Sequence, residues 1–102
     1  MTNRLEILQN LAADRANAFA NYGLAMEYVS TGALESAIEQ FAVLLEHHRN
    51  YGAAYFHAGQ TLEKLGRLDD ARAMYSQGIA VTAANGDQHT RSELQASLDA
   101  LG

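Results

Sequence analysis

The feature that most constrains the fold of this chain is a repeat with a period of 34 residues. The segment GALESAIEQF, which begins at Gly32, returns as GRLDDARAMY, which begins at Gly66. At the same spacing, the aromatic residue Phe41 is matched by Tyr75. A fixed period of this length predicts an array of similar supersecondary units, each of which buries part of its surface against its neighbour.

The spacing of apolar residues predicts that these units are helical. Apolar and small residues recur at i, i+3, i+4 and i+7, which places them on one face of a helix. Proline is absent and alanine is abundant, and both features favour helices over strands. We expect an all-α fold of about six antiparallel helices. The expected segments are 4–13, 17–30, 34–47, one centred on 55–62, 68–84 and 87–101.

The apolar spacing also assigns the inner faces of the helices residue by residue. In the first helix the inner face is expected to hold Leu5, Leu8 and Ala12, widened by Ile7 and Leu11. In the helix over 68–84 the expected inner residues are Leu68, Ala71, Tyr75, Gly78 and Ile79. Asn3 followed by Glu6 has the spacing of an N-terminal capping box, so the first helix should begin just after Asn3.

Composition and charge exclude several classes of function. The net charge is −5 and no cluster of Lys and Arg is present, so a nucleic-acid-binding or membrane-binding surface is not expected. The chain contains no cysteine, which rules out disulfides and thiolate metal sites. There is no signal-peptide pattern and no run of ~20 apolar residues. We therefore expect a cytoplasmic protein.

The two repeated segments resemble the tetratricopeptide repeat (TPR), a helix–turn–helix unit of 34 residues. The family pattern is Trp-x2-Leu-Gly-x2-Tyr, then Ala-x3-Phe, then Pro. In the first segment the residues at the pattern's positions before the proline are Asn21, Leu24, Ala25, Tyr28, Ala37 and Phe41. In the second segment the same positions hold Tyr55, Ala58, Gly59, Leu62, Ala71 and Tyr75. The tryptophan position therefore holds Asn21 and Tyr55, and Arg49 and Ala83 replace the proline.

The resemblance implies one solenoid domain over 1–102, wound as a short right-handed superhelix. Residues 18–51 and 52–85 would form two complete repeats. Residues 1–16 would supply the second helix of an incomplete preceding repeat, and residues 86–102 a C-terminal capping helix. Because about three repeats are usually needed for stability, both flanking helices should be integral to the fold.

In the TPR family the first helices of successive repeats line a concave groove that receives a peptide or a helix of a partner protein. The resemblance therefore implies a non-catalytic protein-interaction module. The residues mapped to the groove are Phe19, Tyr22, Met26, Val29, Phe56, His57, Gln60, Glu63 and Lys64. Two alternatives remain open for the apolar residues among them: a contact between two copies in a homodimer, or burial inside the chain.

Metal binding and catalysis are not expected. His47 and His48 are adjacent, so on a helix they point about 100° apart and do not chelate one ion together. His57 and His89 would approach each other only if the closing helix packs beside the second repeat. No serine lies in a nucleophile-elbow pattern and no glycine-rich phosphate loop is present. We expect neither a metal nor a cofactor.

Overall fold

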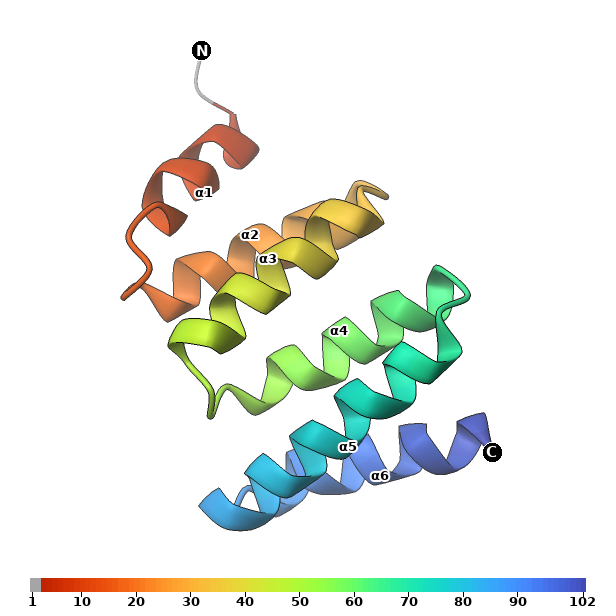
Figure 1. The fold of residues 1–102 in the computed structure, drawn as a ribbon. Helices are drawn as coiled ribbons and strands as arrows, with labels where there is room; N and C mark the ends of the chain where they lie inside the picture. The colour runs from red at the N-terminus through yellow and green to blue at the C-terminus, as the bar shows by residue number, and fades with distance from the viewer. Residues whose placement is uncertain (1–2) are drawn as a thin grey trace. The chain divides into compact units, whose positions relative to one another are not determined.

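The computed structural model describes residues 3–102, which form six α-helices and no β-strand within that range. The chain divides into two compact units, unit 1 (Met1–Arg49) and unit 2 (Asn50–Gly102). Unit 1 holds the first three helices and unit 2 the last three (Figure 1). Their bounds are α1 Arg4–Ala12, α2 Ala18–Ser30, α3 Leu34–His47, α4 Gly52–Lys64, α5 Leu68–Asn85 and α6 Gln88–Leu101. The prediction of an all-α fold with six helices is confirmed.

The turns that follow α2 and α4 have the same geometry, as the repeat predicts. Gly32 and Gly66 both adopt the left-handed conformation, with φ of 81° and 76°. In each turn the amide one residue after the glycine donates to the carbonyl five residues earlier, at 2.9 Å in both cases. This is the Schellman arrangement, which satisfies the last carbonyls of a helix and favours glycine at the left-handed position.

Unit 1 is held together by contacts of α2 with α1 on one side and with α3 on the other. The core between α1 and α2 consists of Ala12, Ala20 and Leu24, with Leu5, Leu8 and Tyr28 packed against it. The Asn3 side chain accepts a hydrogen bond of 2.8 Å from the Glu6 amide, which confirms the predicted cap of α1. Ala25 and Ala37 are fully buried, as expected of small residues where helices cross closely.

The prediction that Ile7 and Leu11 widen the buried face of α1 is wrong. Their exposed fractions are 47% and 50%, whereas Leu5 and Leu8 pack against the core. The physical reason is that α2 is the principal helix in contact with α1. One neighbouring helix covers only one side of α1, so the wider apolar face is left partly in solvent.

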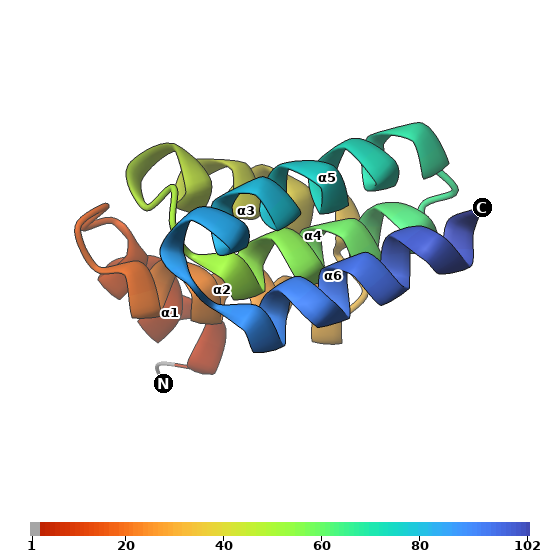
Figure 2. The same ribbon diagram turned by 90° about the horizontal axis from the view of Figure 1, so that it is seen from below.

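Unit 2 is a three-helix assembly in which each helix packs against the other two. Figure 2 shows α6 running alongside α4 and α5. Two glycines allow the close approach. A Cβ atom at Gly59 would lie 2.1 Å from Cε1 of Tyr75, and one at Gly78 would lie 2.6 Å from Cβ of Tyr55 and 2.8 Å from Cδ1 of Leu94. No side chain fits at either position unless its neighbours move.

The longest helix, α5, differs from the prediction at its start. Leu68 is 42% exposed, although it was expected to point inward. It is the first residue of α5, so its side chain lies at the helix end, where fewer neighbours cover it. The helix ends at Asn85, and Gly86 caps it in the left-handed conformation with φ of 80°. Within residues 3–102, even this helix lacks the combination of length and apolar character needed to cross a membrane, and no other helix has it.

Candidate partner-binding surface

The expected groove residues of unit 1 lie on α2, on the side that does not form the core with α1. Phe19 is 81% exposed, which is the largest exposure of any large apolar side chain among the described residues. Tyr22, Met26 and Val29 follow at helical spacing and are half-buried. The core face of α2 holds other residues, with Ala20 and Leu24 buried against α1. The helix α2 therefore has a second apolar face, and Phe19, the first residue of that face, is largely exposed to solvent.

The tryptophan position of unit 1 holds Asn21, whose buried side chain makes several hydrogen bonds that the repeat pattern did not predict. The Asn21 side-chain oxygen accepts bonds from Gln40 Nε2 at 2.7 Å and from Arg15 Nη1 at 3.3 Å. Its amide donates to the carbonyls of Asp14 at 3.2 Å and Asn17 at 2.9 Å. These hydrogen bonds connect α2 to α3 and to the segment between α1 and α2, so the replacement of tryptophan by Asn21 has a structural role.

The expected groove residues of unit 2 lie on α4, where α6 packs beside them. Phe56 and His57 are half-buried, and their rings meet edge to face with centroids 5.1 Å apart. Burial lowers the pKa of His57, and the charge of Lys64 lowers it further, while Glu93 of α6 acts in the opposite direction. His57 is therefore held in its neutral form to a lower pH than a solvent-exposed histidine.

Gln60 and Glu63, also assigned to the groove, bond to residues inside unit 2. Gln60 Nε2 donates to the Tyr75 hydroxyl at 2.8 Å and to Ser97 Oγ at 3.4 Å. The Tyr75 hydroxyl in turn donates to the Glu63 carboxylate. Burial raises the pKa of the Tyr75 hydroxyl, and the hydrogen bond and charge of Glu63 raise it further. These two α4 side chains thus satisfy the hydroxyl of a buried tyrosine, and partner contact by them stays a prediction.

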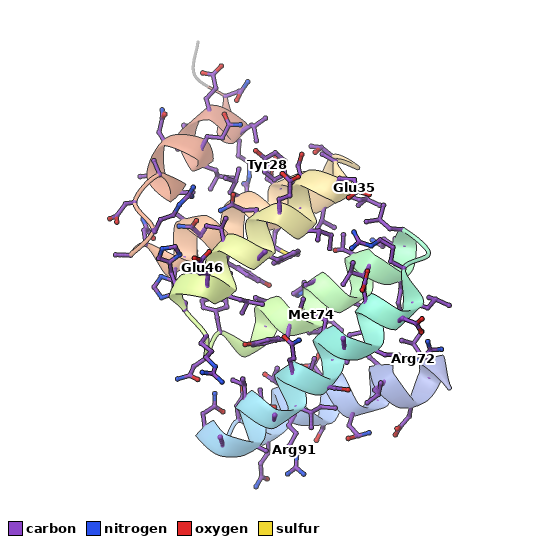
Figure 3. All side chains as sticks on the ribbon, viewed as in Figure 1. Tyr28, Glu35, Glu46, Arg72, Met74 and Arg91 are labelled. Atoms are coloured by element: carbon purple, nitrogen blue, oxygen red, sulfur yellow. The ribbon has the colours of Figure 1, made fainter. Side chains whose placement is uncertain are left out.

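A polar hollow on α6 was not anticipated from the sequence. Its volume is about 360 Å³, and it is lined by Gln88, Arg91, Ser92 and Gln95. These residues follow one another at i, i+3, i+4 and i+7, so they share one face of the helix. Figure 3 shows the Arg91 side chain directed away from the helix ribbons. The sequence predicted only a C-terminal capping helix over residues 86–102, and none of the nine expected groove residues lines this hollow.

The histidines are used in local contacts. His47 Nδ1 lies 3.0 Å from the Val43 carbonyl, and His48 Nε2 lies 2.8 Å from the Arg15 carbonyl. His89 Nε2 lies 3.2 Å from the Glu93 carboxylate, which also interacts with His57 by charge. Over residues 3–102, no three side chains of the metal-ligating types come together in a way that could hold an ion.

Comparison with known proteins identifies the repeat at the level of a family. The model of the tetratricopeptide repeat family matches residues 52–85. The TPR repeat-containing protein PA0015 of Pseudomonas aeruginosa is 31% identical over 91 residues, which cover 89% of this chain and 87% of that protein. The match therefore extends over both units and is not confined to the second repeat.

Solved structures with the same fold include two that are informative. The crystal structure of a tetratricopeptide repeat domain protein from Salinibacter ruber has a TM-score of 0.78 and 35% identity, covering 83% of this chain and 94% of that one. The crystal structure of PcrH in complex with the chaperone binding region of PopD has a TM-score of 0.88 and 26% identity, covering 95% of this chain and 74% of that one. The second structure contains a helical-repeat protein together with a segment of its partner.

Proposed function

Because the chain belongs to the tetratricopeptide repeat family, we propose that it is a non-catalytic module that binds a peptide or helix of a partner protein. The observation that carries the proposal is the second apolar face of α2. A phenylalanine exposed to 81% is costly to leave in water, and it begins a row of half-buried apolar residues on the same helix. An apolar face of this kind is suited to an apolar peptide or to one side of an amphipathic helix.

The chemistry of the α2 face supports a partner that is apolar and adaptable in shape. Tyr22 and Phe19 offer aromatic surface, and aromatic residues are enriched in protein interfaces. Met26 is flexible and polarizable, so it fits partners of differing contour. The net charge of −5 favours a partner with basic residues beside its apolar segment, since complementary charge speeds association and excludes acidic competitors.

In unit 2 we assign Phe56, His57 and Lys64 of α4 to partner contact. Phe56 and His57 are half-buried and Lys64 is exposed. Gln60 and Glu63 belong to the same proposed surface, and their hydrogen bonds with Tyr75 must break or be shared when a partner binds. Partner contact by those two residues should therefore contribute less affinity than contact by the α2 face.

A solved neighbour supports the class of function. PcrH, which shares 26% identity and a TM-score of 0.88 with this chain, was crystallised with the chaperone binding region of PopD. A fold of this shape thus accommodates a segment of another protein.

The proposal can be tested by placing a photo-crosslinking amino acid at position 19 in cells that express the protein. The matched control carries the same amino acid at position 68, because Leu68 is also exposed and apolar but lies on α5. We expect a protein to be captured specifically from position 19. Capture of the same proteins from both positions would contradict an α2-specific site.

A captured partner segment would then be titrated against variants of the α2 face. Phe19→Glu and the double variant Tyr22→Asp/Met26→Glu should each weaken binding at least ~10-fold, which corresponds to ~1.4 kcal/mol. Circular dichroism must show that the helices are retained. Unchanged affinity in folded variants would refute the α2 face as the binding site, and capture of a second copy of this chain would support the homodimer alternative.

A further inference from the structure

The outer side of α1 carries an exposed stripe that the proposed function does not use. The stripe consists of Arg4, Ile7, Leu11 and Asp14, and we call it the α1 stripe. Ile7 and Leu11 are 47% and 50% exposed, and the Arg4 side chain is 76% exposed. Asp14 follows the end of α1, and its amide bonds to the Leu11 carbonyl at 3.3 Å, which continues the turn. Spacings of three, four and three residues keep the stripe on one side of the helix.

The order of charges along the α1 stripe is self-complementary. It begins with a cation, continues with two branched apolar residues and ends with an anion. When a second copy lies antiparallel, Arg4 meets Asp14 of the other copy and Ile7 meets Leu11, and both contacts occur twice by symmetry. A parallel copy would bring Arg4 to Arg4 and Asp14 to Asp14, which is repulsive.

We propose that the α1 stripe is an antiparallel contact surface between two copies of this chain. The apolar centre supplies the contact that removes Ile7 and Leu11 from water, and the charged ends select the antiparallel orientation. The contact is separate from the α2 face, so a dimer formed in this way leaves Phe19 exposed for another partner. One short helix from each copy makes a small interface, so the dimer should be weak and form at high protein concentration.

Both charged ends are available for contacts between copies. The Arg4 Nε atom donates to Glu27 at 2.8 Å, and the rest of the guanidinium is largely in solvent. The Asp14 Oδ1 atom accepts a bond of 3.0 Å from the Ala16 amide, which orients the carboxylate. Its second oxygen has no partner among the described residues. Each group therefore retains hydrogen-bonding capacity while its position is fixed by one internal bond.

Disulfide trapping tests the orientation directly, because the natural sequence contains no cysteine. Ile7→Cys and Leu11→Cys variants would be oxidised separately and as an equimolar mixture. The antiparallel contact predicts that mixed dimers between positions 7 and 11 form faster than either like-with-like dimer. Preferential pairing of 7 with 7 and 11 with 11 would overturn the proposal. Ser76→Cys, on the exposed side of α5, gives the rate of random collision.

Charge reversal tests the ends of the stripe by sedimentation equilibrium over a concentration series. Arg4→Glu and Asp14→Arg should each weaken the wild-type dimer about tenfold or more, because each change creates two repulsive pairs per dimer. An equimolar mixture of the two variants should regain dimerisation, since every pair is again attractive. Arg67→Glu is the matched control, because Arg67 is also exposed and ion-paired, with Asp70 at 2.9 Å.

Two outcomes would overturn the α1 contact. One is a wild-type chain that stays monomeric up to millimolar concentration. The other is a dimer that Phe19→Glu abolishes and that the α1 variants leave unchanged, which would place self-association on the α2 face instead. Loss of the α1 dimer with intact capture of a partner from position 19 would leave the proposed function standing. Circular dichroism must show that each variant retains its helices.

Discussion

The two units place different residues at the same positions of the repeat. They differ in which of two positions holds the larger side chain. Unit 1 has the small residue Asn21 at the tryptophan position and Leu44 at the position 23 residues later, and both are buried. Unit 2 has Tyr55 and Gly78 at the equivalent positions. The Tyr55 side chain occupies the space that Gly78 leaves empty. The larger side chain of the two therefore lies on the second helix of the repeat in unit 1 and on the first helix in unit 2.

The units also differ at a second pair of equivalent positions, which consists of the tryptophan position and the position 19 residues later. In unit 1 the buried amides of Asn21 and Gln40 are joined by a hydrogen bond of 2.7 Å. In unit 2 the equivalent residues are Tyr55 and Met74, and Figure 3 shows Met74 on α5. A buried amide pair is directional and fails if one member is lost, whereas a methionine side chain offers no amide for such a pair. Equivalent positions in the two units should therefore respond differently to the same kind of substitution.

The largest effect is expected from Gly78→Leu, which copies the leucine of unit 1 into unit 2. Even the Cβ atom would lie 2.6 Å from Cβ of Tyr55 and 2.8 Å from Cδ1 of Leu94. Because the nearest atom is a Cβ held by the backbone of α4, the helices themselves must separate. We expect a loss of about 3 kcal/mol or more in the free energy of unfolding, at the upper end of overpacking effects, measured by urea denaturation.

Two further variants sharpen this comparison. Ala80→Leu introduces the same residue on the exposed side of α5 and should change the stability little. Gly78→Leu combined with Tyr55→Asn reproduces the unit 1 pair, but position 55 keeps its Cβ atom, so the double variant should recover only the part of the loss that the tyrosine ring causes. If Gly78→Leu alone were as stable as the natural chain, the volume exchange between the two units would be refuted.

The next largest effect is expected from Asn21→Leu in unit 1. The substitution leaves the buried Gln40 amide without its 2.7 Å partner, and Arg15 also loses a hydrogen-bond acceptor. Stranding a buried polar group costs ~1–3 kcal/mol, so the midpoint of thermal unfolding should fall clearly.

The Gln40→Met variant isolates the cause of that loss. In the double variant Asn21→Leu/Gln40→Met both members of the amide pair are replaced by apolar residues, so no stranded amide remains and much of the stability should return. A double-mutant cycle measures the coupling between the two positions. Additive effects would show that the amide pair is not an energetic unit, contrary to the role assigned to it.

The 34-residue period and the helical spacing of apolar residues were sufficient to predict the helices. Both depend on local geometry that recurs, as in the left-handed turns at Gly32 and Gly66. What the period did not predict is the environment at the ends of the array. Ile7 and Leu11 belong to an apolar face by spacing, but spacing does not reveal how many helices surround that face.

The candidate site was less predictable than the fold, for a related reason. The expected groove residues differ between the two repeats, with Met26 against Gln60 and Val29 against Glu63. The structure supplies a local reason for the polar members of both pairs, since Gln60 and Glu63 bond to the hydroxyl of Tyr75. That link joins side chains on two helices, and helix periodicity alone does not show which side chains meet across a helix pair.

The smallest of the three effects is expected from Tyr75→Phe, which gives unit 2 the residue that unit 1 has at Phe41. At neutral pH the variant removes the hydroxyl that bonds Gln60 and Glu63, and we expect a loss of ~1 kcal/mol. The loss stays modest because the two partners are half-buried and water can reach them in part.

The same variant has a signature in alkali. Because burial and Glu63 raise the pKa of Tyr75 in the folded chain, the folded state keeps its proton at a pH where the unfolded state, with a pKa near 10, loses it. The stabilisation is therefore complete below pH ~10 and declines as the pH rises above that value. Urea denaturation across this range should show a steeper decline for the natural chain than for Tyr75→Phe, and equal slopes would contradict the raised pKa.

The reciprocal variant, Phe41→Tyr, completes the comparison of the two units. The positions in unit 1 that correspond to Gln60 and Glu63 hold Met26 and Val29, neither of which offers an amide or a carboxylate. The added hydroxyl would also enter a fully buried site. We expect Phe41→Tyr to destabilise the chain, and Phe41→Tyr combined with Val29→Glu to recover part of the loss by restoring an acceptor. Because Val29 is also assigned to the α2 face, recovery of stability together with loss of partner binding would separate the structural use of this position from its use in recognition.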